Sequence, residues 1–263
     1  MCIISEPVKE VEATKILVAI NANQTRQMVV YSNRVDNDSA TNAMILPVPN
    51  AHTIQFHDLS KHKNIFKDLD RSFLSSMITT NSFSYSANQT PLAIIDVGSY
   101  QVSLAPTTAD LLRIDTTVFS ISAGCLDLLK SDYATNYGFI VCKLKQGNAT
   151  YHPFAYSHQI VNKDAIFVPT KHYHEHATTD FQDFQYETNE DTNHDETWSH
   201  NIYLYNCKAP NQQLMGNYTH TWLKRNPLIF DYNTIDFDFG HCHNLEKYTI
   251  NGEYPNKDIL VSV

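Results

Sequence analysis

Short apolar runs separated by polar turns recur along most of this chain, and they limit the fold more than any other feature. Residues 14–22 and 26–33 have strand-like composition around a polar turn at 23–25, which predicts an opening β-hairpin. A second hairpin is predicted where residues 137–144 are followed by a return over 150–160. The 15 Tyr and 13 Phe suit this interpretation, because aromatic residues favour strands. Further strands are predicted at 42–48, 53–57, 92–97, 100–104, 165–168, 203–205, 228–239 and 257–263.

Three short segments predict helices instead. Apolar residues recur at three- and four-residue spacing over 60–77, which is typical of an amphipathic helix. Thr107 and Asp110 have the spacing of a capping box before a second helix. Residues 122–130 are a third helical candidate. We therefore predict an α+β, mainly antiparallel β fold of hairpins, sandwich-like, with two or three short helices.

One globular domain over residues 1–263 is the simplest organisation, with a possible seam at the polar stretch 79–90. The region between His172 and Cys207 holds eight acidic residues and no Lys or Arg. Few apolar residues occur over 177–197, so we expect an acidic surface loop there. Such a loop is a candidate docking element for a protein partner or for a second copy of the chain.

Charge and composition exclude several classes of protein. The formal net charge is −9, which disfavours a nucleic-acid binder, because phosphate contacts supply most of that affinity. Only 7 Gly are present and no G-x-G-x-x-G occurs, so a nucleotide cofactor is not expected. No apolar run approaches the roughly 20 residues of a membrane span. Five scattered cysteines without a C-x-x-C favour reduced thiols and a cytoplasmic location, in a host cytoplasm or a virion if the protein is viral.

Histidine is concentrated in the second half of the chain. Seven of the 13 histidines lie between His152 and His200. In an extended segment His172, His174 and His176 share one face, because a strand alternates sides at each residue. Imidazoles gathered in this way suit a divalent transition metal such as Zn, Fe, Mn or Ni. Further candidate ligands are His200, His241 and His243, with Glu187 and Asp195.

Three kinds of function remain open from these residues. The first is a metal-binding protein, including a metal-dependent hydrolase or oxygenase with ligands His172, His174 and His200 and with Glu175 or Glu187 activating water. The second is a structural or assembly protein, such as a homo-oligomer or virion component. The third is an N-terminal-nucleophile hydrolase acting through Cys2. We favour a binding or structural role over an enzyme, because no complete catalytic constellation can be assembled.

Four short segments carry a resemblance to a known group of proteins. They are 43–49 (AMILPVP), 152–158 (HPFAYSH), 167–174 (FVPTKHYH) and 198–203 (WSHNIY). Together they resemble a family of uncharacterised soluble proteins of microbes and large DNA viruses. The resemblance implies no established activity and no catalytic residues. It implies that five histidines share one site, namely His152, His158, His172, His174 and His200.

Overall fold

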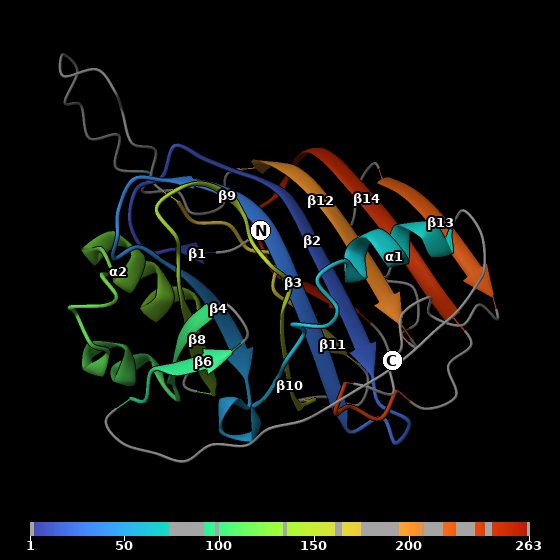
Figure 1. The fold of residues 1–263 in the computed structure, drawn as a ribbon, viewed down its shortest axis with the longest axis horizontal. Helices are drawn as coiled ribbons and strands as arrows, with labels where there is room; N and C mark the ends of the chain where they lie inside the picture. Colours follow the sequence, from blue (N-terminus) through green and yellow to red (C-terminus); the bar gives the residue numbers. More distant parts are fainter. Residues whose placement is uncertain are drawn as a thin grey trace.

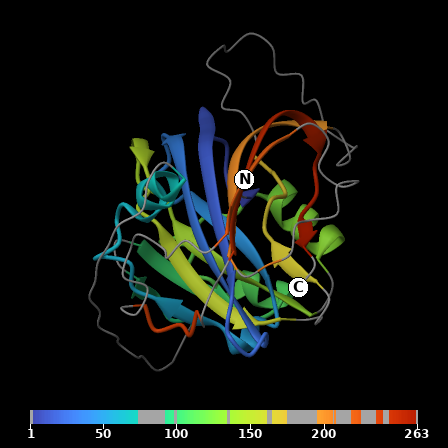
Figure 2. The same cartoon turned by 90° about the vertical axis from the view of Figure 1, so that its right-hand side faces the viewer.

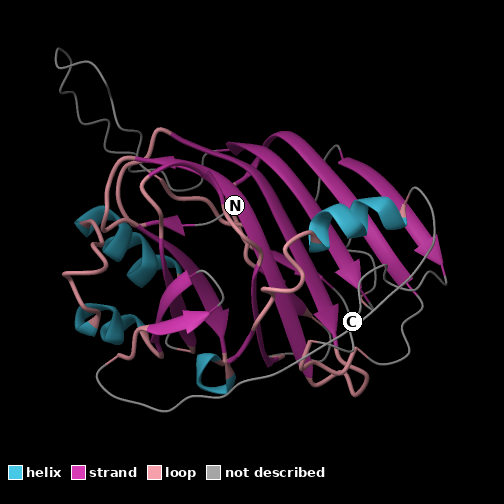
Figure 3. Ribbon diagram, viewed as in Figure 1, coloured by secondary structure: helices cyan, strands magenta, loops and turns pink. Residues whose placement is uncertain are grey.

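Mainly antiparallel β-sheets are the principal regular structure in the described part of this protein, whose structure is a computed structural model (Figure 1). Short helices accompany the sheets (Figure 3), so the prediction of a mainly antiparallel β fold with a few short helices is confirmed. The structure describes residues 3–73, 92–97, 100–133, 136–160, 165–174, 195–205, 207, 218–224, 235–239 and 244–261.

The larger sheet has eight strands, and the predicted opening hairpin lies at its centre. β2 (Glu10–Ile20) and β3 (Arg26–Asn37) pair antiparallel. β2 also pairs in parallel with β12 (Asp195–Tyr205), from the distant second half of the chain. The remaining strands are β5 (Gln55–His57), β9 (Gly147–Thr150), β10 (Phe154–Gln159), β13 (Tyr218–Lys224) and β14 (Asn244–Pro255). The order is β13, β14, β12, β2, β3, β10, β5, and β9 also pairs with β3.

Two smaller sheets complete the strand content of the described residues. A five-stranded antiparallel sheet has the order β1, β4, β8, β7, β6, with bounds β1 (Ile3–Ile4), β4 (Ala43–Pro49), β8 (Tyr137–Lys143), β7 (Tyr100–Ala105) and β6 (Ile95–Val97). β11 (Ile166–Val168) pairs antiparallel with β15 (Ile259–Val261). The two residues of β1 are fully buried, so the chain enters the interior from its first described residue.

Helix starts follow the capping residues that the sequence offers. α2 (Ala123–Asp132) begins after Ser122, whose Oγ accepts a hydrogen bond from the amide of Cys125. The predicted capping box at Thr107 starts a 3₁₀ helix, η2 (Thr108–Arg113). The other helices are α1 (Ile65–Ser72) and the 3₁₀ helix η1 (Ala51–Thr53).

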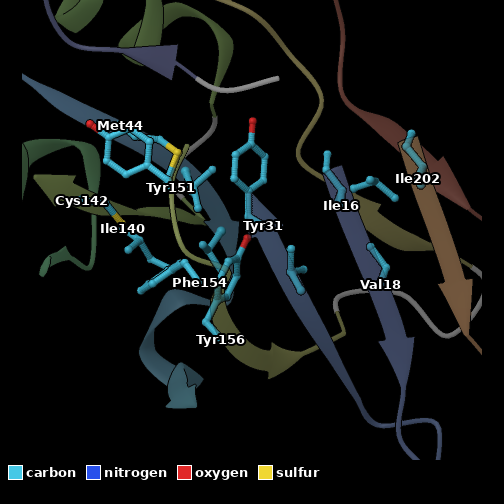
Figure 4. Packing of buried hydrophobic residues seen from close by; sticks show 14 of the residues in the cluster. Ile16, Val18, Tyr31, Met44, Ile140, Cys142, Tyr151, Phe154, Tyr156 and Ile202 are labelled. Atoms are coloured by element: carbon cyan, nitrogen blue, oxygen red, sulfur yellow. The ribbon is translucent and has the colours of Figure 1, made fainter. Parts of the chain in front are cut away.

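The main core lies between the two large sheets (Figure 4). Ile16 and Val18 of the eight-stranded sheet and Ile140 and Cys142 of the five-stranded sheet belong to this one buried cluster. Alternate residues such as Leu17 face the opposite side of the large sheet, because successive strand residues alternate. α1 covers that side, whereas α2 covers the outer side of the smaller sheet. Figure 2 shows these two helices on opposite sides of the strands.

The second predicted hairpin is wrong. β8 pairs with β4 and β7 in the smaller sheet, whereas β10 pairs with β3 and β5 in the larger one. The chain therefore crosses between sheets after Lys143 instead of returning beside the same strand. Periodicity identifies each strand but does not identify its partner, because pairing depends on packing far along the chain.

Three other predictions need correction. The acidic loop predicted over 177–197 includes the first residues of β12, which pairs with β14 from Asp195 onward. Residues 235–239, predicted as part of a strand, form no strand, and 235–237 are bends. The histidine segment is not a regular strand in its described part, where Tyr173 makes an isolated parallel bridge to Ile3. β13 and β14 were not predicted. Residues 79–90 and 175–194 lie outside the described residues.

Within the described residues, no helix has the length and apolar character that crossing a membrane would require.

Candidate functional site

The described part of the histidine segment runs beside the N-terminal strand. The amide of Ile4 donates to the carbonyl oxygen of Tyr173 at 2.7 Å, and Ile3 is the bridge partner of the same tyrosine. Because Tyr173 lies between His172 and His174, this contact fixes the position of the backbone that carries both imidazole side chains. In its described part the segment has no regular strand pairing, and it contacts the two-residue strand β1.

The turn between β14 and β15 holds the same segment from another side. Asn256 Oδ1 accepts from the amide of His172 at 2.7 Å, and Asn256 Nδ2 donates to the carbonyl oxygen of His172 at 2.9 Å. Asp258 Oδ1 accepts from the amides of Thr170 and Lys171 at 2.7 and 2.8 Å. These four hydrogen bonds fix the backbone from Thr170 to His172.

Long-range pairing brings His200 to this segment. His200 lies on β12 between Thr14 of β2 and Ile250 of β14. Its ring centroid is 5.2 Å from that of His172, and His174 lies 6.4 Å from His172. His172 therefore has both His174 and His200 as ring neighbours.

Burial determines the charge of the central pair. His172 and His200 are each 1% exposed. Burial is the main cause that lowers the pKa of His172 well below its ordinary range, and the neighbouring His200 and His174 add to this effect. Burial likewise lowers the pKa of His200. Both imidazoles are therefore neutral at pH 7, the form in which histidine binds metals.

A complete metal site is not formed by the residues that the structure describes. No group of three or more His, Cys, Asp or Glu side chains among them has an arrangement that could hold an ion. The remaining predicted ligands, His176, His241 and His243, lie outside the described residues, as do Glu175, Glu187 and Cys2.

The other two histidines assigned to the site by resemblance have different neighbours. His158 lies on β10, where Nδ1 is 2.9 Å from the carbonyl oxygen of Gln159 and the ring stacks on Tyr156. His152 precedes β10, and its carbonyl oxygen accepts a hydrogen bond from Tyr100. Neither has a described contact with His172, so the structure does not unite all five.

A second polar cluster lies among residues for which the sequence predicts no site. His57 Nε2 lies 2.9 Å from Ser157 Oγ, and the guanidinium of Arg26 donates to the same hydroxyl at 3.1 Å. The pair has the distance of a nucleophile and its base. However, Ser157 is fully buried and His57 is 4% exposed, so a substrate has no direct access to the hydroxyl. No local motif marks this cluster, because its members come from three different strands.

Comparison with known proteins identifies the fold. No protein-family model matches the chain. Among solved structures, it is similar to baculovirus P35 with a TM-score of 0.52 and 12% identity, over 100% of this chain and 99% of the other. The chain shares the fold of baculovirus P35.

Two further structures of P35 give weaker matches at the same 12% identity. The caspase-8/P35 complex has a TM-score of 0.48, with 96% of both chains covered. A mutated baculovirus P35 after caspase cleavage has a TM-score of 0.45, with 95% of this chain and 99% of the other covered.

Proposed function

We propose that this protein acts by binding another protein, and that its partner is a cysteine protease of the caspase class. The observation that carries the proposal is the match to the baculovirus P35 fold along the whole chain. P35 itself has been solved in a complex with caspase-8 and after cleavage by a caspase. A shared fold does not by itself establish a shared partner, so the partner needs a direct test.

A binding role also agrees with the chemistry of the interior. The Ser157–His57 pair lies at a reactive distance but is buried, which argues against its use as a hydrolytic centre. The acidic segment 177–197 is the element that we propose for docking a partner, because a stretch of like charges steers and orients an oppositely charged surface.

The test is an inhibition and binding assay with purified caspases. The protein is incubated with caspase-8 and with an executioner caspase, and hydrolysis of a fluorogenic peptide is followed. We expect loss of protease activity at about one chain per active site, with a complex on size-exclusion chromatography. Full protease activity at tenfold excess of the protein, together with no complex, would sink the proposal. Baculovirus P35 serves as the positive control.

Neutralising charges tests the docking element. In the variant Glu187→Gln/Glu190→Gln/Asp191→Asn we expect weaker and less salt-dependent binding than in the natural chain. The matched control neutralises three exposed acids elsewhere, Glu10, Asp96 and Asp127. Equal losses in both variants would assign the effect to net charge instead of to the segment. Light scattering on the same samples tests the alternative that the segment joins copies of this chain.

A divalent transition-metal site is a second candidate function, and one distance favours it. With Zn–N bonds of about 2.0–2.1 Å and a tetrahedral angle, two coordinated imidazole rings have centroids about 5.2 Å apart. The His172 and His200 centroids are separated by 5.2 Å. His174 is more than an ångström too far from His172 for the same geometry. A site would therefore need His174 to move, or a further ligand such as His176, His241 or His243.

Elemental analysis tests the metal candidate. Protein purified without an affinity tag or chelator is measured by inductively coupled plasma mass spectrometry. We expect about one Zn, Fe, Mn or Ni per chain, with loss of the metal in His172→Ala and His200→Ala and retention in the control His52→Ala at an exposed histidine. Metal-free protein that also takes up no added Zn or Ni would exclude the site.

A further inference from the structure

Residues 235–239, which we call the cover, lie against the face of the large sheet that carries His57. Ile235 and Phe239 are buried in the apolar cluster of that face. His57 on β5 is paired with Ala155 on β10, and Ala155 belongs to the same cluster. Because directly paired residues of neighbouring strands share a face, His57 and the cover lie on the same side of the sheet.

Side-chain packing holds the cover in place. The ring of Phe237 meets that of His57 edge to face, with centroids 6.1 Å apart. The ring of Phe239 packs edge to face on Phe237, at 4.9 Å, and on Tyr205 of β12, at 5.6 Å. The cover contains bends and no helix or strand, so it lacks the ladder of backbone hydrogen bonds that fixes the strands below it. Segments of this kind open at a lower free energy than core strands.

The surroundings of His57 suit a neutral imidazole and not its cation. The residue is 4% exposed, and Nε2 lies 2.9 Å from Ser157 Oγ, which already accepts from Arg26 at 3.1 Å. In the cation both ring nitrogens carry protons. Protonation would therefore place an N–H on Nδ1, a buried nitrogen with no hydrogen-bond partner in the structure, and a second donor beside Ser157. Both changes favour a state in which the ring is reached by water.

Charges around the ring act in opposite directions. Arg26 of β3 repels a charged His57, Asp236 of the cover attracts it, and β10 presents the neutral hydroxyl of Ser157. Burial is the largest effect, and the balance lowers the pKa of His57 to about 4. Asp236 is exposed, so its carboxylate attracts the imidazolium toward solvent. A proton on His57 is thus disfavoured under the cover and favoured outside it.

We infer that the cover is an acid-operated device, closed over the large sheet while His57 is neutral and opened when the imidazole takes up a proton. Opening removes Phe237 from the ring and exposes Phe239 and Tyr205, while the two large sheets stay intact. Water then reaches the imidazole, whose pKa returns to its ordinary value of 6.5. The ratio of open to closed molecules should rise by up to about tenfold per pH unit between pH 6.5 and about pH 4.

Hydrogen exchange of the full chain, measured by mass spectrometry, tests the device. Exchange is followed at pH 7, 6 and 5, and the rates are corrected for the intrinsic effect of pH on amide exchange. We expect peptides that contain the cover to lose protection by up to about tenfold per pH unit below pH 6.5. Peptides from β3 and β10 should keep their protection. Loss of protection in β3 and β10 at the same pH would mean that the whole fold opens, and it would overturn the inference.

Variants assign the effect to one imidazole. His57→Gln keeps a group that can hydrogen-bond Ser157 but takes up no proton, so exchange of the cover should lose its dependence on pH. His52→Gln, at an exposed histidine, is the matched control and should behave as the natural chain does. Phe237→Ala should raise exchange of the cover at every pH, because it removes the ring that packs on His57. A dependence on pH that survives in His57→Gln would contradict the inference.

Titration of the natural chain decides the matter if His57→Gln does not fold. The ring proton signals of His57 are assigned through its backbone and followed by NMR over the same range of pH. We expect the midpoint of this titration to coincide with the midpoint for loss of protection in the cover. An imidazole that titrates while the cover stays protected would show that the two are not coupled, and the inference would fail.

Discussion

At the scale of single residues, Gly138 on β8 is placed where no side chain fits. A Cβ built on it would lie 2.7 Å from the carbonyl oxygens of Ala105 and Pro106 and closer still to the Cβ of Ala51. These are backbone or rigid atoms that cannot swing away. We expect Gly138→Ala to lower the free energy of unfolding by about 3 kcal/mol, as overpacking does in a dense core. Urea denaturation measures it. Gln101→Ala, at an exposed position on β7, should change the value little.

Asn42 illustrates a residue whose polar atoms are fully used. Its Oδ1 accepts from Ser5 Oγ and from the amides of Glu6 and Ala43, and its Nδ2 donates to the carbonyl oxygen of Glu6 and to Asn37 Oδ1. The contacts with Ser5 and Glu6 hold the chain just after β1, and the contact with Asn37 joins Asn42 to the end of β3. Removing a buried group with several partners leaves each partner unsatisfied.

We therefore expect Asn42→Ala to lower the free energy of unfolding by about 3 kcal/mol. Differential scanning calorimetry and urea unfolding measure the loss. Asn23, exposed in the turn between β2 and β3, provides the matched Asn→Ala control. A loss at Asn42 no larger than at Asn23 would mean that the network contributes nothing to stability.

At the scale of elements, α1 docks on the large sheet through an apolar face and one carboxylate. Ile65, Phe66 and Leu69 are buried against the sheet. Asp70 accepts hydrogen bonds from the hydroxyl of Tyr203, at 2.7 Å, and from Nζ of Lys247. Burial raises the pKa of Asp70, but the bonds from Lys247 and Tyr203 outweigh it and leave the pKa below its ordinary value.

Neutralising the Asp70 carboxylate should weaken the packing of α1 on the large sheet. We expect Asp70→Asn to lower the free energy of unfolding by about 1–2 kcal/mol at pH 7. The expected loss is smaller than for a fully buried carboxylate, because the Asp70 side chain is 33% exposed and solvent screens its charge. A group with a lowered folded pKa stabilises the fold above its unfolded pKa, so the difference between variant and natural chain should vanish as pH falls through the folded pKa. Asp68→Asn, which loses only a surface pair with Arg71, is the control. Equal stability of the two variants would contradict a docking role for Asp70.

At the scale of the whole molecule, buried histidines make stability depend on pH. Burial lowers the pKa of His57 to about 4, with Asp236 raising it and Arg26 lowering it. Burial also lowers the pKa of His158 to about 4. Between pH 6.5, the ordinary pKa of histidine, and about pH 4, the unfolded chain therefore binds more protons at these two sites than the folded chain does. Stability is complete above pH 6.5 and declines as pH falls through this window.

The slope of this decline is measurable. Each buried histidine contributes up to about 1.4 kcal/mol per pH unit inside the window. Urea midpoints from pH 7 to pH 5 should fall less steeply in His57→Gln/His158→Asn, whose amides keep the hydrogen bonds of the ring nitrogens. His52→Asn, at an exposed histidine, should retain the natural slope. An unchanged slope in the double variant would assign the acid sensitivity to other groups.

Much of the local structure could be predicted from the sequence. The hairpin of β2 and β3, the helix start at Ser122 and the strand around Cys142 all follow from nearby residues, because turn geometry, capping and side-chain periodicity act over a few positions. The concentration of histidine near His172 was likewise visible, since it is a property of composition.

Tertiary structure decided which of these parts meet. The sequence by itself determined a mainly antiparallel β protein with a histidine-rich segment. Only the fold placed β12 in parallel beside β2. This pairing brought the ring centroid of His200 to 5.2 Å from that of His172. The fold also brought Asn256 and Asp258, from the turn between β14 and β15, to the backbone of that segment. Strand pairing depends on the apolar surface that both sheets bury together, and residues far apart in the chain contribute to that surface.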